Sequence, residues 1–340
     1  MIVPLSTSNS NIRLPVLPWG RLWLFTLCMV AICLGSYEML WRWRGFVPMP
    51  RDDMGLWLLQ RNKVRPHDRE QVVILGASQS QSDYELDTFE RLYGHRPMQL
   101  AVFSSSCLPV LDQLARDESF QGIVLVDVVY WACYEGMYPS PRDERQQRYV
   151  NKYDSRSAGW WLEEQLGSWI DRHVVIRQTA FNLEQILRAI GQHRWPELPR
   201  SRTSQDREQK YTFPKNEPIA SSTPVVPIET VHPEDPASFY RDMAKLRGRV
   251  ERITNRGGKV IFVALPLAGF GREYNLKRFP REQFFDRLIA ESGATAGIYF
   301  MDYAVLRDLV PPDGSHLDQS DIGRFTEAFV GILQEKLIGK

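Results

Sequence analysis

The chain of 340 residues is long enough for one large α/β domain or two small ones, and its hydrophobic (43%) and charged (24%) contents are ordinary for a globular protein. Lys and Arg number 42 and Asp and Glu number 41, so a net charge of +1 gives no electrostatic case for nucleic acid as a partner. The cysteines Cys28, Cys33, Cys107 and Cys133 form no Cys-x-x-Cys pair and fit neither a zinc site nor a disulfide framework. We expect no metal and no cofactor.

An uncharged apolar segment lies near the N-terminus, at residues 22–37. Extended to residue 41, it approaches the roughly 20 residues that cross a bilayer. Aromatic residues flank both ends as in an interfacial belt: Trp19, Trp23, Tyr37, Trp41 and Trp43. We predict an N-terminal tail at 1–18 and a retained transmembrane anchor at 19–43. A cleaved signal peptide is the main alternative, but no small-x-small cleavage site follows the apolar run.

Flanking charges give a weak indication of membrane orientation. Arg13 and Arg21 precede the apolar segment, and Arg42, Arg44 and Arg51 follow it. This distribution leans toward a cytoplasmic C-terminal domain by the positive-inside rule. The difference is small, and long domains translocate largely regardless of flanking charge, so the charges alone leave the orientation open.

The remainder of the chain alternates between strand and helix patterns. A polar, Pro-containing juxtamembrane connector is expected at 44–69, with a short helix near 54–60. Apolar runs typical of buried strands follow at 72–75, 98–103, 122–129, 260–265 and 297–302. Helical spacing is found at 87–93, 108–116, 237–254, 281–292 and 322–337. This alternation predicts an α/β fold over 70–340, with a five-strand parallel sheet between two layers of helices.

Residues 140–235 interrupt the alternation and are predicted to be an insertion between the third and fourth strands. Residues 160–190 are expected to be helical, because apolar positions are interleaved with charged ones. Residues 196–236 are rich in Pro, Ser and Thr and are expected to form a long loop. Loops of that length inside a compact domain are uncommon and are often functional, for example as lids.

Two polar turns are expected at the same edge of the sheet. The Gly76-Ala77-Ser78 turn ends the first strand, and the Asp313-Gly314-Ser315-His316 run follows the fifth. Ligands of open parallel sheets bind at the carboxyl ends of the strands. A serine hydroxyl needs a base within hydrogen-bond reach, and the base needs a carboxylate that orients it. Ser78, His316 and Asp313 are therefore the candidate nucleophile, base and orienting group, with Ser80 and Ser82 as competing nucleophiles.

Further groups at this edge would stabilise a developing oxyanion or line the pocket. The backbone N–H of Ser78 is one candidate donor, and that of Ser104, in the turn after the second strand, is another. Asp127 and Tyr130 follow the third strand and are expected to line the pocket. The alternative for Asp127 is a turn-capping role.

These blocks resemble those of the SGNH (GDSL-like) hydrolase superfamily, whose domain has a flavodoxin-like sheet. The similarity covers residues 70–135 and 258–330 and looks closest to the membrane-anchored branch, which includes proteins of alginate and lipoteichoic-acid acyl transfer. The resemblance implies that Ser78 is the nucleophile, with Asp313 and His316 as its partners. It places Ser104 where the family usually has Gly. The family's Asp is replaced by Ala77, and no Asn is found at 127–130.

The resemblance implies a serine esterase or O-acyltransferase that acts on an envelope glycan through an acyl-enzyme. It also implies an extracytoplasmic domain on a single-pass cytoplasmic-membrane protein, against the small charge difference. Expected partners are an ester or glycan substrate, the lipid bilayer and a membrane-bound acyltransferase. The alternative is a catalytically weak scaffold that binds a glycan or organises an envelope assembly, which the missing Asn and Gly favour.

Overall fold

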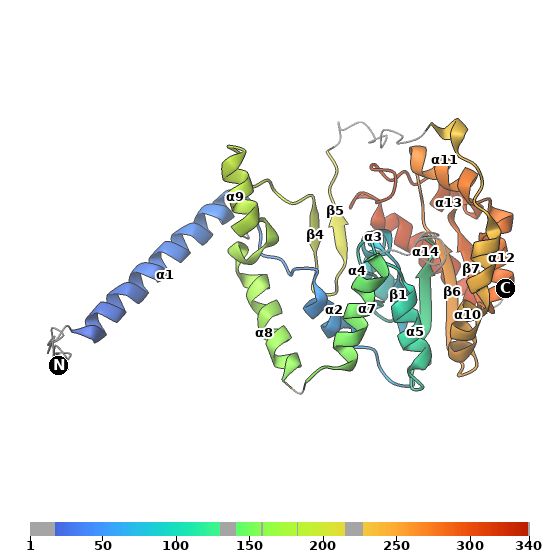
Figure 1. Cartoon of the computed structure of the whole chain (residues 1–340), viewed down its shortest axis with the longest axis horizontal. Helices are drawn as coiled ribbons and strands as arrows, with labels where there is room; N and C mark the ends of the chain where they lie inside the picture. The colour runs from blue at the N-terminus through green and yellow to red at the C-terminus, as the bar shows by residue number, and fades with distance from the viewer. Residues whose placement is uncertain (1–17, 130–140, 158, 182, 215–226, 339–340) are drawn as a thin grey trace, which may run out of the picture. The chain divides into compact units, whose positions relative to one another are not determined.

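The computed structural model describes residues 18–129, 141–157, 159–181, 183–214 and 227–338 (Figure 1). The chain divides into two compact units, Met1–Val47 and Pro48–Lys340, and each is described by itself. Cys133 and Tyr130 lie outside the described residues.

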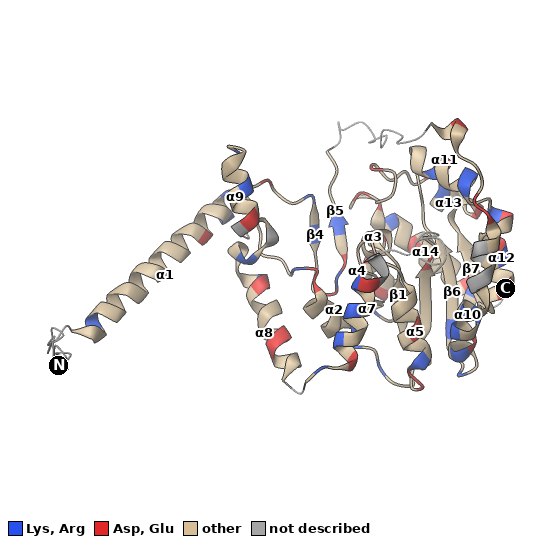
Figure 2. Ribbon diagram, viewed as in Figure 1, with Lys and Arg blue, Asp and Glu red and all other residues tan. Residues whose placement is uncertain are grey.

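The first unit contains helix α1, Trp19–Trp43, which matches the predicted anchor in its bounds. It is long and apolar enough to cross a membrane. No charged residue occurs between Arg21 and Glu38, and Figure 2 shows this part of α1 as a long tan stretch between a blue and a red band. Glu38 pairs with Arg42 one turn later, at 2.8 Å. At the end of α1 the ring of Trp41 packs edge-on against that of Phe46.

The second unit is built on a five-stranded, fully parallel sheet, as the sequence predicts. Its strands are β1 Val72–Leu75, β2 Met98–Gln99, β3 Ile123–Asp127, β6 Lys259–Ala264 and β7 Ala296–Tyr299. The strand order is β2-β1-β3-β6-β7. In register, Ile74 of β1 pairs with Leu125 of β3, which pairs with Ile261 of β6. Because β1 lies inside the sheet, its carboxyl end is flanked by strands on both sides.

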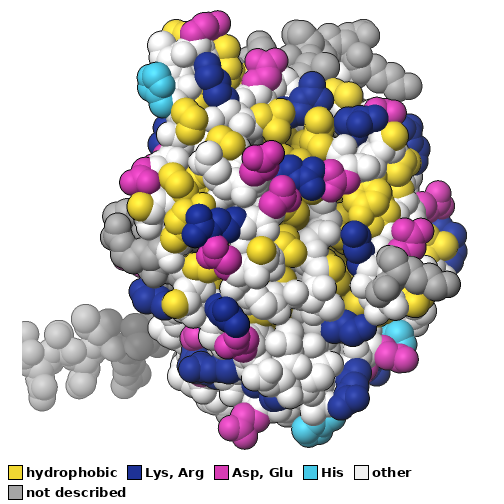
Figure 3. Space-filling view, turned by 90° about the vertical axis from the view of Figure 1, so that its right-hand side faces the viewer, with side chains coloured by type: hydrophobic (Ala, Val, Ile, Leu, Met, Phe, Trp, Pro, Cys, Tyr) yellow, Lys and Arg dark blue, Asp and Glu magenta, His cyan; other side chains and the backbone are white. Residues whose placement is uncertain are grey.

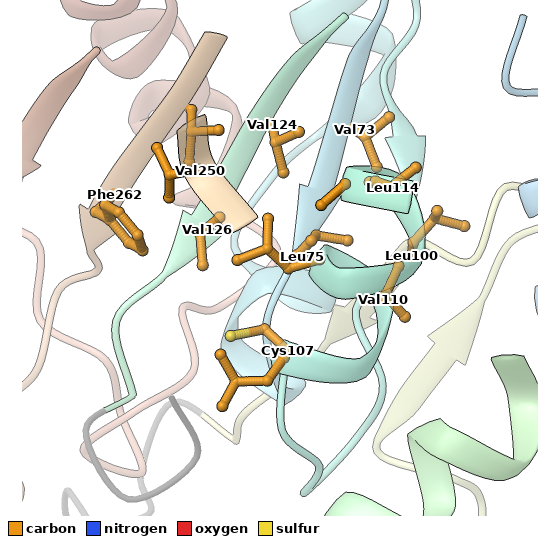
Figure 4. Close-up of a cluster of buried hydrophobic side chains, with 14 of the residues drawn as sticks. Val73, Leu75, Leu100, Cys107, Val110, Leu114, Val124, Val126, Val250 and Phe262 are labelled. Atoms are coloured by element: carbon orange, nitrogen blue, oxygen red, sulfur yellow. The ribbon is translucent and has the colours of Figure 1, made fainter. Parts of the chain in front are cut away.

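Alternate residues of each strand enter two separate cores, because successive side chains of a strand point to opposite faces. On one face, Val73, Val124 and Phe262 pack under helices (Figure 4). These helices are α2 Met54–Arg61, α5 Leu108–Arg116, α10 Pro236–Thr254 and α12 Phe285–Ser292. The other face is covered by α4 Leu86–Tyr93, α13 Ala304–Arg307 and α14 Ile322–Ile338. The sheet is thus buried on both sides, which explains its continuous apolar strands.

The predicted connector at 44–69 differs from the structure in one respect. Helix α2 is part of the core rather than of an exposed linker, and Trp57 is fully buried there. The indole Nε1 of Trp57 donates a hydrogen bond to the carbonyl of Leu100, at 3.0 Å. Asp53 caps the N-terminus of α2 by accepting from the N–H of Leu56. An eight-residue helix shows too few apolar repeats to reveal from sequence that it is buried on all sides.

The segment between β3 and β6 contains helices and a hairpin. Its elements before α10 are α7 Pro141–Asp154, α8 Trp160–His173, η1 Val175–Arg177, η2 Thr179–Phe181, α9 Leu183–Gly191, β4 Ser201–Thr203, β5 Gln209–Tyr211 and η3 Ile228–Thr230. The β4–β5 hairpin was predicted as loop, and that prediction is wrong. Polar contacts fix the hairpin: buried Arg207 donates to Asp52 at 2.7 Å and to the carbonyl of Gln99 at 3.0 Å. Such anchors leave no apolar periodicity in the sequence.

The remaining short elements are α3 Ser78–Ser82, α11 Gly269–Arg278, η4 Arg281–Gln283 and η5 Phe300–Asp302. Two of them, η4 and η5, change the bounds of elements that the sequence predicts. The helix predicted at 281–292 is broken into η4 and α12, and the strand predicted at 297–302 ends at Tyr299 and continues as η5. Figure 3 shows the side of the unit that carries α10 and α12, where acidic and basic side chains are intermixed.

Truncation of Trp57 tests whether α2 belongs to the core. Trp57→Ala removes a fully buried indole and a buried hydrogen bond, and it should lower the free energy of unfolding by about 3–5 kcal/mol. Chemical denaturation of the full-length protein in detergent measures this change. Trp195→Ala is the matched control, since that ring is 62% exposed and its loss should cost about 0.5 kcal/mol or less. Equal effects of the two substitutions would contradict a core role.

Candidate active site

Ser78 lies at the first position of α3, directly after the turn that ends β1. Its side chain is half-buried, whereas Ser80 and Ser82 on the same helix are fully buried. Ser80 donates a hydrogen bond to Asp127 at the end of β3, at 3.0 Å. Ser82 donates to the neighbouring Asp83, at 2.8 Å. The two competing serines are therefore engaged inside the protein, and Ser78 is the serine of this helix that borders open space.

Gly76 is required by the close packing of this turn. A Cβ atom built at Gly76 would lie 2.1 Å from the Oγ of Ser80 and 2.7 Å from the Cβ of Asp127. Both distances are shorter than real Cβ contacts, and neither neighbour is at the end of a flexible chain. Glycine therefore allows the β1 turn to approach the Ser80–Asp127 pair, which in turn fixes the start of α3.

The Asp313-Gly314-Ser315-His316 run forms a compact turn around the carboxylate of Asp313. One carboxylate oxygen, Oδ1, accepts from the backbone N–H groups of Ser315 at 2.9 Å and His316 at 2.7 Å. Gly314 has a φ of +91°, a conformation that favours glycine. The carbonyl of Gly314 accepts from the N–H of Ala268, at 3.0 Å, which ties the turn to the loop after β6.

The second carboxylate oxygen of Asp313 binds the imidazole of His316. The Nδ1–Oδ2 distance is 2.7 Å, as the nucleophile–base–carboxylate arrangement requires. Burial lowers the pKa of His316, but the hydrogen bond and charge of Asp313 outweigh it, and the net shift is upward. Burial raises the pKa of Asp313, while the hydrogen bond and charge of His316 bring it down to about 2. The predicted dyad is thus present as an ion pair whenever the imidazole is protonated.

The other imidazole nitrogen of His316 is buried and, within the described residues, has no hydrogen-bond partner. The structure therefore brings His316 to Asp313 but does not form the Ser78–His316 hydrogen bond. One face of the imidazole is covered by Tyr211 from β5, with ring centroids 4.8 Å apart and planes inclined by 24°. Next to this pair, the N–H of Gln319 donates to the carbonyl of Tyr211 at 2.8 Å. The insertion thus reaches the candidate site.

A cavity of about 420 Å³ opens at the carboxyl ends of β1, β3, β6 and β7. Ser78, Asp127, Asp313 and Ser315 border it. Much of its wall is apolar and comes from the loop after β6, from α11, from the end of β7 and from η5: Leu267, Phe270, Leu276, Phe279, Tyr299 and Phe300. Arg272 and Asn275 of α11 add polar groups. The cavity can therefore hold an apolar group next to the Ser78 hydroxyl.

Two buried acids lie under this site. Burial raises the pKa of Asp127 to about 7, against the stabilising hydrogen bond from Ser80. Burial likewise raises the pKa of Asp83 to about 7, although the charge of His316 and the N–H of Leu317 favour its ionised form. Asp83 is the residue after α3 and its Oδ1 accepts from Leu317, so it links α3 to the chain that follows His316.

The predicted oxyanion and pocket groups have mixed outcomes. Asp127 lies on the cavity wall, as predicted. Ser104 is not among the residues that line the cavity, but its φ of +51° shows that the turn has the left-handed backbone for which Gly would be favoured. The prediction for Tyr130 falls outside the described residues. Asp83, Tyr211 and Arg272 were not predicted, and no local motif marks them, because each reaches the site through tertiary packing.

Among the described residues, no group of three or more His, Cys, Asp or Glu side chains is placed to hold a metal ion. The chain matches no protein-family model, no curated protein and no solved structure. The geometry of this site and the sequence blocks that form it are therefore what indicate a function.

Removal of the Asp313 charge should lower the pKa of His316. The carboxylate stabilises the imidazolium, so Asp313→Asn should bring this pKa down toward or below the ordinary histidine value. An NMR titration of the protein with isotope-labelled histidine measures the change directly. Asp308→Asn, which removes a carboxylate that is 67% exposed, is the control and should leave the titration of His316 in place. An unchanged pKa in Asp313→Asn would show that the ion pair does not form.

Proposed function

We propose that this protein is a membrane-anchored serine esterase or O-acyltransferase of the SGNH hydrolase type. The observation that carries the proposal is the state of His316. Its Nδ1 is held by Asp313 and its Nε2 has no partner among the described residues, which leaves the nitrogen that a general base would present to Ser78. Ser78 borders the same cavity as Asp313, at the edge of the sheet where such folds bind ligands.

The strand order supports the finer assignment of the fold. Numbered along the chain within the sheet, β2-β1-β3-β6-β7 is the order 2-1-3-4-5, which doubly wound flavodoxin-like sheets have. The SGNH-like blocks lie after the first, second and fifth strands of this order, at the carboxyl edge. The left-handed Ser104 also supports it, since the family usually has Gly at that position.

The reaction would begin with attack of the Ser78 Oγ on an ester carbonyl while Nε2 of His316 takes the hydroxyl proton. The C–O bond of the ester then breaks, the imidazolium returns its proton to the leaving alkoxide, and the acyl group stays on Ser78. An acceptor hydroxyl, from water or a glycan, attacks the acyl-enzyme and gives its proton to His316. The bond between the acyl carbon and the Ser78 Oγ then breaks, and the imidazolium returns the proton to Ser78. Asp313 holds the imidazole tautomer and stabilises the imidazolium at each stage. Hydrolysis and transfer differ only in the acceptor.

The apolar cavity wall suits the acyl part of the substrate, and the glycan acceptor comes from the family resemblance. A membrane-bound acyltransferase is the proposed source of the acyl group, because the resemblance places this domain outside the cytoplasmic membrane. The preformed backbone N–H of Ser78, at the start of α3, is the proposed first oxyanion donor.

A second candidate function is a scaffold that binds a glycan without turning it over. The missing Ser78–His316 hydrogen bond favours this alternative, as does the absence of Ser104 from the cavity wall. The two functions differ in one chemical property, because only the enzyme has an activated Ser78.

A fluorophosphonate probe distinguishes these functions. The full-length protein in detergent should be labelled, and Ser78→Ala should lose labelling and ester turnover by roughly 10³-fold or more. Ser157→Ala, which alters an exposed serine far along the chain from these blocks, is the matched control and should be labelled like the wild type. A protein that is not labelled, or whose labelling survives in Ser78→Ala, would favour the scaffold.

Membrane orientation has a separate test. We expect an alkaline phosphatase fused after Lys340 to be active, because that reporter works only outside the cytoplasm, and a green fluorescent protein at the same point to stay dark. The reverse pattern would place the second unit in the cytoplasm and would contradict the extracytoplasmic role. It would leave the chemistry of Ser78 untouched.

A further inference from the structure

Helix α8 exposes an apolar stripe on the side opposite to its buried face. Trp160 and Asp171 are its buried residues. The stripe consists of Trp161, Leu162, Leu166 and Trp169, which are 49%, 67%, 56% and 52% exposed. At about 100° per residue these four positions span an arc of about 140°. Single exposed apolar residues are ordinary, but four large ones on one helix face indicate a surface that another apolar phase covers.

Ion pairs and packing fix α8 to the start of the second unit. Asp171 is buried and accepts from Arg51 and from Arg177, each at 2.9 Å. Gly55 of α2 packs so closely on Glu164 of α8 that a Cβ atom at Gly55 would collide with its carboxylate. Any surface on α8 is therefore held at a fixed place relative to residues 51–55.

The length of chain between α1 and Arg51 limits how far α8 can lie from the end of α1. Helix α1 ends at Trp43, and Arg51 follows eight residues later. Eight residues span at most about 28 Å when fully extended. If α1 crosses a membrane, Arg51, which binds Asp171 of α8, must lie within about that distance of the point where α1 leaves it. This limit comes from the covalent chain and holds for any arrangement of the two units.

We propose that the apolar stripe of α8 lies in the headgroup interface of the bilayer that α1 spans. Tryptophan and leucine gathered on one face of a helix are typical of helices that lie in the membrane interface. Here Arg172 and His173 close the last turn, and the ring of Trp169 packs on that of His173. Exposed Glu163 lies outside the stripe's arc. This contact would hold the candidate site at a set height above the membrane, which suits a substrate presented at its surface.

The test places a fluorophore at position 166 of the full-length chain in vesicles of phosphatidylcholine and phosphatidylglycerol. Leu166→Cys is made in a chain whose Cys28, Cys33, Cys107 and Cys133 are Ala, and lipids with a spin label high on the acyl chain quench the probe. We expect quenching several-fold stronger than at Leu92→Cys, a control site on α4 that is 38% exposed. Adding Leu162→Glu and Trp169→Glu should reduce it toward the control.

The inference rests on the proposed membrane anchor but not on the proposed chemistry. Equal quenching at positions 166 and 92, in a protein that resists carbonate extraction, would overturn the inference and leave the anchor in place. If carbonate extracts the protein from the vesicles, the result would contradict both the membrane anchor and the inference. A second copy of the chain could instead cover the stripe. The probe at position 166 would then be shielded from solvent only at high protein density, with energy transfer between labelled chains, and this result would also overturn the proposal. Fluorophosphonate labelling is independent of each outcome.

Discussion

The carboxylate of Asp313 is the interaction on which the candidate site depends. It accepts two backbone N–H groups and the Nδ1 of His316, so a single side chain shapes the turn and also orients the base. Hydrogen bonds to the ionised form favour it, which agrees with the pKa of about 2. Because the loop after β6 holds Gly314 in turn, the position of the base relative to the cavity is set by backbone contacts rather than by one rotamer.

The insertion is coupled to this turn by buried polar contacts. Asp52, just before α2, accepts from Gln81 of α3 and from Arg207, so α3 and the β4–β5 hairpin share one carboxylate. The same hairpin places Tyr211 on His316. Leaving any of these charges without its partner inside the protein would be costly, so the hairpin, α3 and the entry to α2 are expected to hold their positions together.

The sequence predicts the parts of this protein that depend on local patterns. Strand β1 and helix α5 have the predicted bounds, because their apolar periodicity and flanking Gly, Pro and Asp residues act over a few positions. The Asp313–His316 contact is also local. The β4–β5 hairpin and the stacking of Tyr211 could not be predicted, because they depend on partners 100 or more residues away. The catalytic assignment of Ser78 stays a prediction, since proximity to a cavity does not establish reactivity.

The buried acids bear on how this site would stabilise negative charge. An ionised Asp127 beside the cavity would oppose an oxyanion, but its pKa of about 7 leaves it largely neutral below neutral pH. A protonated carboxyl can donate a hydrogen bond, a property that the absent Asn would otherwise supply. The raised pKa values of Asp83 and Asp127 make the free energy of unfolding depend on pH in the opposite direction to the lowered pKa of Asp313. Protonation of Asp83 and Asp127 stabilises the fold below their ordinary pKa of 3.8, and this contribution is lost as the pH rises to about 7. The neutral form of Asp127, which would not oppose an oxyanion, is thus also the form that burial in the fold favours.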